Sequence, residues 1–297
     1  MRYDVIIAGG SYAGMSAGLQ LARARRKVLV IDAGQRRNRF AATSHGFLGQ
    51  DGRAPADIAE DARAQLMAYP TVEWLSDSAI DAAAEAGGFS VETARGQRYS
   101  ARRLLLATGV IDDLPEVDGL AERWGKSVFH CPYCHGYELE QGPIGVLATS
   151  EMSLHHALML PDWGPTTFFL NGAFEPDPEQ RASLEQRGVV VVSERVERIE
   201  GERANVVLAD GQMKEIDGLF VLPRTRVAGS LAASLDCELE DGPLGAFIQT
   251  DLTRETSVPG VFACGDAAMP FGSVALSVGD GVRAGSGVHR SLIFAKA

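Results

Sequence analysis

The sequence is poor in basic residues and in cysteine, and it has no long apolar run. Lysine and arginine number 28 against 39 acidic residues, and the net charge of −11 argues against a nucleic-acid partner, which needs clustered basic side chains. No apolar stretch approaches the roughly 20 residues that cross a bilayer, so no membrane partner is expected. Four cysteines are too few for a disulfide scaffold in 297 residues. No basic segment followed by an apolar one opens the chain, so a cytoplasmic protein is expected.

Glycine is abundant, with 33 residues, and one glycine cluster follows the first apolar run. The chain begins with the apolar run "YDVIIA", followed by "GGSYAG", a helix-like segment "MSAGLQLARARR" and a second run "KVLVID" that ends in Asp32. Gly9 and Gly14 occupy the first and third glycine positions of a dinucleotide-binding turn, and Ser11 occupies the second. Glycines let the backbone approach a pyrophosphate, the helix N-terminus attracts its charge, and the acid accepts from a ribose hydroxyl. The pattern predicts a dinucleotide site.

Two further apolar runs are each followed by a short polar turn. "RRLLLATG" ends at Gly109, and "TSVPGVFACGDAA" contains Gly265 and Asp266. With the N-terminal unit they resemble the FAD domain of two-dinucleotide flavoprotein disulfide reductases. The resemblance implies FAD as cofactor, Asp266 on its ribityl chain, and the helix in "SVALSVGDGVRAG" beside the flavin. The expected cofactor residues are Gly9, Gly10, Ser11, Tyr12, Ala13, Gly14, Asp32, Ala33, Gln35, Arg37, His45, Ala79, Ala107, Thr108, Gly109, Gly265, Asp266, Ser273, Val274 and Ala275.

The segment "FHCPYCHGYE" places Cys131 and Cys134 two residues apart and follows them with His135. A structural zinc site needs four ligands, and Cys237 and Cys264 are isolated, so no metal is expected. A glutaredoxin active site shares the spacing but requires its pair just after an early strand of a small domain. Redox chemistry beside a flavin is the third interpretation, and it needs two thiols because the second resolves the mixed disulfide formed by the first.

A cysteine pair in an insert of a flavoprotein resembles low-molecular-weight thioredoxin reductases, over essentially the whole chain. "CPYCHGYE" is more similar still to a branch that includes the gliotoxin- and holomycin-type dithiol oxidases. The resemblance implies that Cys134 faces the flavin and that Cys131 exchanges with substrate. His135 stands where thioredoxin reductases have an acid, and an imidazole can carry a thiol proton.

An internal repeat begins a few residues later. Shifting the N-terminal unit by 139 residues overlays it on "PIGVLATSEMSLHHALML" and "TTFFLN", which predicts a second Rossmann-type unit. Its nucleotide-binding residues are lost, because Ala148, Ser150 and Ser153 replace the turn residues and Asn171 replaces Asp32. Where NADPH-using relatives have arginines for the 2′-phosphate, this chain has "NGAFEPDPEQR", rich in acids. Tight NADPH binding is therefore not expected.

Several functions remain open from the sequence. The first is a dithiol oxidase, in which a small-molecule or protein dithiol reduces the cysteine pair, the pair reduces FAD, and O₂ reoxidises the flavin to give H₂O₂. The second is a thioredoxin reductase-type enzyme that uses NADPH weakly or takes electrons from ferredoxin or another flavin. The third is a flavin redox sensor without turnover, which would not need a second, resolving thiol.

The predicted fold is α/β, with two Rossmann-like, three-layer (ββα) domains of which the second is inserted into the first. The FAD domain is expected at 1–113 and 227–297 and the insert at 114–226. Within the insert, 189–223 is expected to form an antiparallel strand meander. The resemblance also implies a homodimer. Cys237 and Cys264 are expected to be buried, and of His155 and His156 we expect one partly buried and one exposed.

Overall fold

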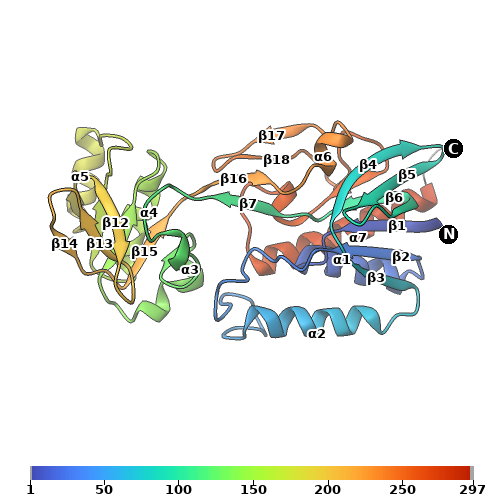
Figure 1. Cartoon of the computed structure of the whole chain (residues 1–297), viewed down its shortest axis with the longest axis horizontal. Coiled ribbons are helices and arrows are strands. Elements are labelled where there is room, and N and C mark those ends of the chain that lie inside the picture. The colour runs from blue at the N-terminus through green and yellow to red at the C-terminus, as the bar shows by residue number, and fades with distance from the viewer. Residues whose placement is uncertain (1, 295–297) are drawn as a thin grey trace. The chain divides into compact units, whose positions relative to one another are not determined.

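The computed structural model describes residues 2–294, and the chain divides into two compact units (Figure 1). The first unit contains the chain up to Arg39, Pro55–Ile111 and everything from Thr225 onward. The second contains Phe40–Ala54 and Asp112–Arg224. The boundaries lie close to the expected ones, at 111 rather than 113 and at 224 rather than 226. The segment Phe40–Ala54, which we expected in the first unit, packs with the second.

The first unit is built on a largely parallel sheet. Its strands have the order β3-β2-β1-β6, with β19 also pairing in parallel with β6, and β5 and β4 continue the sheet with antiparallel pairing. The central strands are buried on both faces, as their continuous apolar sequences predict. The strands are β1 (Arg2–Ala8), β2 (Val28–Asp32), β3 (Val72–Ser76), β4 (Ala79–Glu85), β5 (Gly88–Thr93), β6 (Arg98–Leu106) and β19 (Val261–Ala263).

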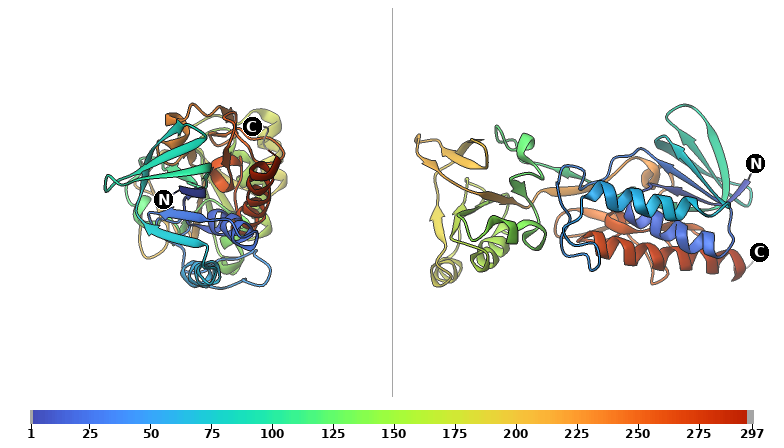
Figure 2. Two further views of the ribbon diagram at one scale, coloured as in Figure 1. Left: turned by 90° about the vertical axis from the view of Figure 1, so that its right-hand side faces the viewer. Right: turned by 90° about the horizontal axis from the view of Figure 1, so that it is seen from below.

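Helices cover one face of this sheet, and smaller strands cover the other (Figure 2). Helix α1 packs between α7 and α2, and the opposite face of β1, β2 and β6 packs against α6, β18 and the β4–β5 pair. The chain crosses between the units on β7 and β16, which pair with each other. These elements are α1 (Tyr12–Arg23), α2 (Pro55–Met67), β7 (Val110–Asp113), β16 (Arg224–Val227), α6 (Leu231–Ser234), β17 (Leu239–Asp241), β18 (Ala246–Ile248), the 3₁₀ turn η4 (Gly265–Ala268) and α7 (Val274–Phe294).

The second unit repeats the three-layer plan around a parallel sheet of order β11-β10-β9-β15-β8. Helices α4 and α5 pack on one face, and the antiparallel sheet β12-β13-β14 packs on the other. The predicted α/β class with two Rossmann-like units is confirmed. The elements are η1 (Ala121–Arg123), β8 (Val128–Phe129), α3 (Pro132–His135), η2 (Tyr137–Leu139), β9 (Ile144–Leu147), α4 (Ser153–Met159), η3 (Leu160–Asp162), β10 (Thr166–Phe169), α5 (Pro178–Gln186), β11 (Val190–Val192), β12 (Val196–Glu200), β13 (Asn205–Leu208), β14 (Met213–Lys214) and β15 (Gly218–Val221).

The predicted meander over 189–223 is only partly correct. Its middle part, β12 to β14, is antiparallel as expected, with a turn at 209–212. Its two ends instead join the parallel sheet, β11 beside β10 and β15 between β9 and β8. Burial explains the difference for β15, which is covered on both faces and has no polar alternation. Within residues 2–294, no helix is both long and apolar enough to span a membrane.

His156 lies in the core of the second unit, whereas its neighbour His155 is exposed, in agreement with the sequence expectation. The His156 ring meets Phe220 edge-on at 6.3 Å, and its Nδ1 atom is buried without a hydrogen-bond partner among the described residues. Burial lowers the pKa of His156 to about 4, and the charges of His130 and His155 add to the effect. The folded unit therefore keeps this imidazole neutral at pH 7.

This burial makes the second unit sensitive to acid. The unfolded chain binds a proton on His156 near pH 6.5 and the folded chain only near pH 4, so stability falls as pH drops through that window. The free energy of unfolding should decrease by about 2 kcal/mol from this residue between pH 7 and pH 5. His156→Leu should remove this dependence, measured as the urea midpoint of tryptophan fluorescence at both pH values. The control His155→Leu should leave it unchanged, and an equal slope in both variants would contradict the assignment.

Candidate active site

The turn between β1 and α1 forms a tight backbone cradle. Gly9 has φ +107°, and a Cβ atom there would lie 2.2 Å from the Ala107 carbonyl oxygen at the end of β6. A Cβ atom on Gly14 would lie 1.9 Å from the Gly9 carbonyl oxygen. Ser11 is the N-cap residue of α1, so the first N–H groups of the helix, which have no acceptor within the helix, face the turn. The cradle has the form that a pyrophosphate group requires.

Asp32, at the end of β2, is held in place by this turn. Its Oδ1 atom accepts a hydrogen bond from the Gly10 N–H at 3.0 Å, and Gly10 has no room for a side chain because Trp74 and Asp32 pack against it. The second carboxylate oxygen is left for a further donor. This geometry agrees with the ribose-binding role expected of Asp32.

A second acidic residue lies at the end of β19. Asp266 accepts from Arg37 Nη1 at 2.9 Å and from Ser277 Oγ at 3.2 Å. Arg37 is thus joined to the expected ribityl-binding residue. Two residues after the end of the neighbouring strand β6, the Oγ1 atom of Thr108 is buried without a hydrogen-bond partner among the described residues. A group bound at this edge of the sheet would give the Thr108 hydroxyl a partner.

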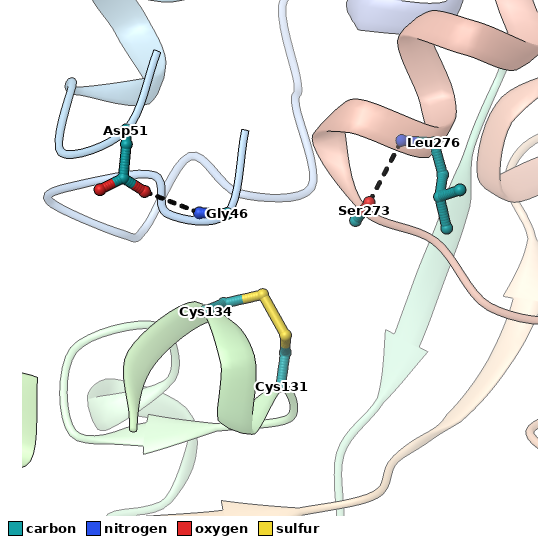
Figure 3. The surroundings of a disulfide bond; sticks show 6 residues. All are labelled: Gly46, Asp51, Cys131, Cys134, Ser273 and Leu276. Carbon is teal, nitrogen blue, oxygen red and sulfur yellow. Dashed lines mark hydrogen bonds between the residues drawn. A yellow bond between two sulfur atoms is a disulfide. The ribbon is translucent and has the colours of Figure 1, made fainter. Parts of the chain in front are cut away.

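The other predicted cofactor residues fall at the same edge of the sheet, with two exceptions. Ser273 caps α7, accepting from the Leu276 N–H at 3.2 Å (Figure 3). Ala79 begins β4 and packs against the core of the unit. His45 belongs to the second unit by its contacts. The predicted residues at the carboxyl ends of β1, β2, β6 and β19 or at the start of α7 are Gly9, Gly10, Ser11, Tyr12, Ala13, Gly14, Asp32, Ala33, Gln35, Arg37, Ala107, Thr108, Gly109, Gly265, Asp266, Ser273, Val274 and Ala275.

The sequence interpretation missed a buried ion pair beneath Asp266. Asp280 is 6% exposed, accepts from Arg254 Nε at 2.5 Å, and accepts from the Gly265 N–H at 2.9 Å. It therefore fixes the backbone immediately before Asp266. The sequence did contain a sign of this ion pair. Asp280 is a carboxylate on the buried face of α7, where an apolar residue is usual. Taken together, the cradle, the two acids and the unpartnered Thr108 hydroxyl fit an FAD molecule.

The cysteine pair lies in the second unit. Cys131 is the N-cap residue of α3, Pro132 occupies the first helical position, and Cys131 and Cys134 form a disulfide with a Cα–Cα distance of 5.3 Å (Figure 3). We call α3 and η2, residues Pro132–Leu139, the redox helix. The disulfide leaves neither sulfur available as a thiolate metal ligand in this state. Among the described residues, no group of three or more His, Cys, Asp or Glu side chains has the geometry of a metal site.

His135 follows Cys134 directly in the sequence and ends α3. Its ring stacks on Phe129 with centroids 4.3 Å apart and planes 20° from parallel. Burial, with smaller contributions from the charges of His130 and His45, lowers the pKa of His135 to about 4. The imidazole is consequently neutral beside the disulfide and free to accept a proton. A thiolate formed next to it would raise this pKa, since opposite charges favour the protonated ring.

The segment Phe40–Ala54 contacts the redox helix through His45. Its Nε2 atom lies 3.3 Å from Glu138 Oε1, and its Nδ1 atom lies 3.5 Å from Asp51 Oδ1. Asp51 also accepts from the Gly46 N–H at 2.8 Å, which closes the segment on itself (Figure 3). The sequence offered His45 as a cofactor residue but no sign of this contact.

The two remaining cysteines are structural. Cys237 and Cys264 are both buried and free. Burial raises the pKa of each thiol, and the nearby Asp280 carboxylate raises that of Cys264 further. Both are therefore poor nucleophiles, and their burial agrees with the expectation from the sequence.

Known proteins resemble this chain over nearly its whole length. The family model for pyridine nucleotide-disulphide oxidoreductases matches residues 3–158 and 169–283. Thioredoxin reductase sirT of Leptosphaeria maculans is 33% identical over 97% of this chain and 93% of its own length. The crystal structure of an oxidoreductase from Agrobacterium tumefaciens is 56% identical, covers all of both chains and has a TM-score of 0.97. The crystal structure of HlmI is 37% identical over 98% of this chain and 92% of its own, with a TM-score of 0.91.

These matches agree with the two Rossmann-like units of the structure. The resemblance to thioredoxin reductase-like flavoproteins is confirmed, and FAD is the cofactor. The chain therefore belongs to the pyridine nucleotide-disulphide oxidoreductase family, as an FAD-dependent enzyme of the thioredoxin reductase type that acts on sulfur groups.

Proposed function

We propose that this enzyme is a dithiol oxidase, which converts a dithiol to a disulfide through Cys131, Cys134 and FAD and delivers the electrons to O₂. The observation that carries the proposal is the state of the nucleotide site in the second unit. There the hydrogen-bonding groups that would hold a pyridine nucleotide are occupied by the protein's own side chains. Electrons then need a source other than NADPH, and the cysteine pair can supply them from a substrate dithiol.

The turn after β9 shows how the site is filled. In the first unit β1 and α1 are separated by three residues, Gly9 to Ser11, whereas β9 and α4 are separated by five, 148–152. Ser153 takes the place of Gly14 and is 1% exposed. Its Oγ atom accepts from the Thr149 N–H at 3.0 Å, and the Thr149 hydroxyl donates to the Leu222 carbonyl at 2.7 Å. The N–H that a phosphate would need is already bonded.

The positions that would bind the ribose and the phosphates of a nucleotide have also lost their binding groups. Asn171, the counterpart of Asp32, uses its Oδ1 atom to accept from the Val196 N–H at 2.9 Å. Glu151, in the turn itself, accepts from Gln180 Nε2 at 2.7 Å, which keeps a carboxylate where a pyrophosphate would lie. Arg181 forms an ion pair with Glu175. A 2′-phosphate with about two negative charges would meet the carboxylates of Glu151 and Glu175 in this region, and Arg181 is already paired with Glu175.

The cysteine pair carries out the exchange with the substrate. A substrate thiolate attacks Cys131, forming a mixed disulfide and releasing Cys134 as a thiol; the second substrate sulfur then displaces Cys131. Two S–H bonds break in the substrate and two form on the cysteines, together with the transfer of two electrons. FAD, when bound, supplies the redox chemistry that accepts these electrons and passes them to O₂, with H₂O₂ as product. The neutral His135 ring can take the thiol proton at the start and return it at the end.

The names of the relatives favour a second candidate, a thioredoxin reductase-type enzyme that reduces a disulfide of a small molecule or of a thioredoxin-like protein. It would take electrons from weakly bound NADPH or from another donor. Steady-state oxygen consumption separates the two. The oxidase consumes O₂ with dithiothreitol alone and forms one H₂O₂ per disulfide. Turnover of an aromatic disulfide with NADPH, without oxygen uptake from dithiols, would establish the reductase instead.

A further inference from the structure

A buried ion pair joins the loop after β18 to helix α7. The Arg254 Nε atom lies 2.5 Å from Asp280 Oδ1, and its Nη2 atom contacts the same oxygen. The Nη1 atom donates to the Thr250 hydroxyl at 3.0 Å. The Arg254 side chain is 15% exposed and that of Asp280 is 3% exposed. Each charge therefore depends on the other, because removing one partner of a buried pair leaves the second charge uncompensated.

This pair holds the end of β19 from two sides. The Arg254 carbonyl accepts from the Ala263 N–H at 3.0 Å, and Asp280 Oδ2 accepts from the Gly265 N–H at 2.9 Å. Gly265, the first residue of η4, has φ +70°, and a Cβ atom there would lie 2.8 Å from the Ala13 Cβ atom in the first turn of α1. The turn η4 is thus fixed against the helix that begins at the pyrophosphate cradle.

Asp32 and η4 lie on opposite sides of that cradle. Strand β1 pairs with β2, which ends in Asp32, on one side and with β6 on the other. The same residues of β6, 104–106, pair with both β1 and β19, so β19 and the η4 turn that follows it lie beyond β6. A dinucleotide with one ribose on Asp32 and its pyrophosphate at the β1–α1 turn directs its other half toward η4. In FAD that half is the ribityl chain and the flavin.

We infer that Arg254 and Asp280 hold η4 in the position that binds the flavin half of FAD, and that they do not affect the binding of its ADP half. The η4 side chain that serves this half is Asp266, which Arg37 and Ser277 orient. Arg254 acts through Asp280 and the Gly265 N–H, and so it is a positioning residue. The inference concerns cofactor binding and goes beyond the proposed function, since it holds for electron flow in either direction.

Arg254→Met removes the charge but keeps an unbranched apolar side chain. The unpaired Asp280 carboxylate is then hydrated or protonated, which weakens its hold on the Gly265 N–H. The Kd of FAD for the apoprotein, followed by quenching of flavin fluorescence, should rise about tenfold, as for the loss of one hydrogen bond to a charged group. The Kd of ADP, measured by calorimetry, should stay that of the wild type. Arg254→Lys restores the charge and should bind FAD more tightly than Arg254→Met.

The double variant Arg254→Met/Asp280→Leu separates positioning from folding. An apolar pair leaves no unpaired charge in the core, so the urea midpoint of the apoprotein should recover from that of Arg254→Met. No carboxylate then accepts from the Gly265 N–H, and the loss of FAD affinity should persist. The control Arg283→Met changes an exposed arginine of α7 that donates to the Leu252 carbonyl, and it should bind FAD as the wild type does.

Wild-type FAD affinity in Arg254→Met overturns the inference. An equal loss of affinity for FAD and ADP also overturns it, since the whole dinucleotide site would then have loosened. The same holds if the wild-type apoprotein does not bind ADP, because the two halves would have no separate sites. If Arg254→Met does not fold, the double variant decides, and wild-type FAD affinity there contradicts the role of the pair.

Discussion

Cys134→Ser should abolish dithiol oxidation while leaving the yellow flavoprotein intact. With Cys131 alone the enzyme cannot form the internal disulfide, so a substrate thiolate has no disulfide to attack and no electrons pass on. We expect the turnover rate to fall on the order of 10³-fold or more, as when a catalytic nucleophile is removed. The FAD spectrum should persist, because the cradle lies in the first unit and the disulfide in the second. Oxygen uptake with dithiothreitol is the measurement.

Cys237→Ala is the matched control for this substitution. Cys237 is buried, and its Sγ atom lies 3.8 Å from the Thr256 hydroxyl in the core of the first unit. Its loss should leave turnover close to that of the wild type. Dithiol oxidation that continues in Cys134→Ser would contradict the assignment of the pair, whatever the control shows.

Gly14→Ala should prevent tight binding of FAD. The added methyl would lie 1.9 Å from the Gly9 carbonyl oxygen, so the turn has to open or α1 has to move away from the sheet. A displacement that costs about 3 kcal/mol corresponds to roughly a 100-fold loss of affinity. The measurement is FAD binding to the apoprotein, followed by quenching of flavin fluorescence.

The control adds the same methyl group to a helix where it has space. Gly279 lies on the exposed face of α7, with nothing within 4 Å of the position of a Cβ atom. Gly279→Ala should bind FAD as the wild type does and should stabilise the helix slightly. Equal FAD affinity in Gly14→Ala and Gly279→Ala would show that the β1–α1 turn is not the pyrophosphate cradle.

The first unit could be predicted from the sequence because its signals are local. The apolar runs, the glycine turn and Asp32 lie within 32 residues, and each is a direct consequence of a strand, a close backbone approach or a ribose contact. Even so, α1 begins at Tyr12 and ends at Arg23, about three residues before the expected segment at each end. Arg25 adopts a positive φ of 58°, which helps to end the helix.

The parts that could not be predicted depend on contacts between distant residues. The contact of His45 with Glu138 joins segments far apart in the chain, and no local pattern encodes it. Asn171 reads as a conservative replacement of Asp32, yet only the structure shows its side chain bonded to the Val196 N–H. The parallel placement of β11 and β15 likewise depends on which neighbours they meet. The "GLFVLP" run that contains most of β15 was the signal for a parallel strand buried on both faces.

In the proposed oxidase, electrons enter the flavin from a dithiol through Cys131 and Cys134, and not from a pyridine nucleotide. Anaerobic rapid mixing of the flavoprotein with dithiothreitol, and separately with NADPH, tests it most directly through the loss of flavin absorbance. Bleaching by the dithiol only is expected, followed by release of H₂O₂ when air is admitted. Rapid bleaching by NADPH at micromolar concentration would contradict it.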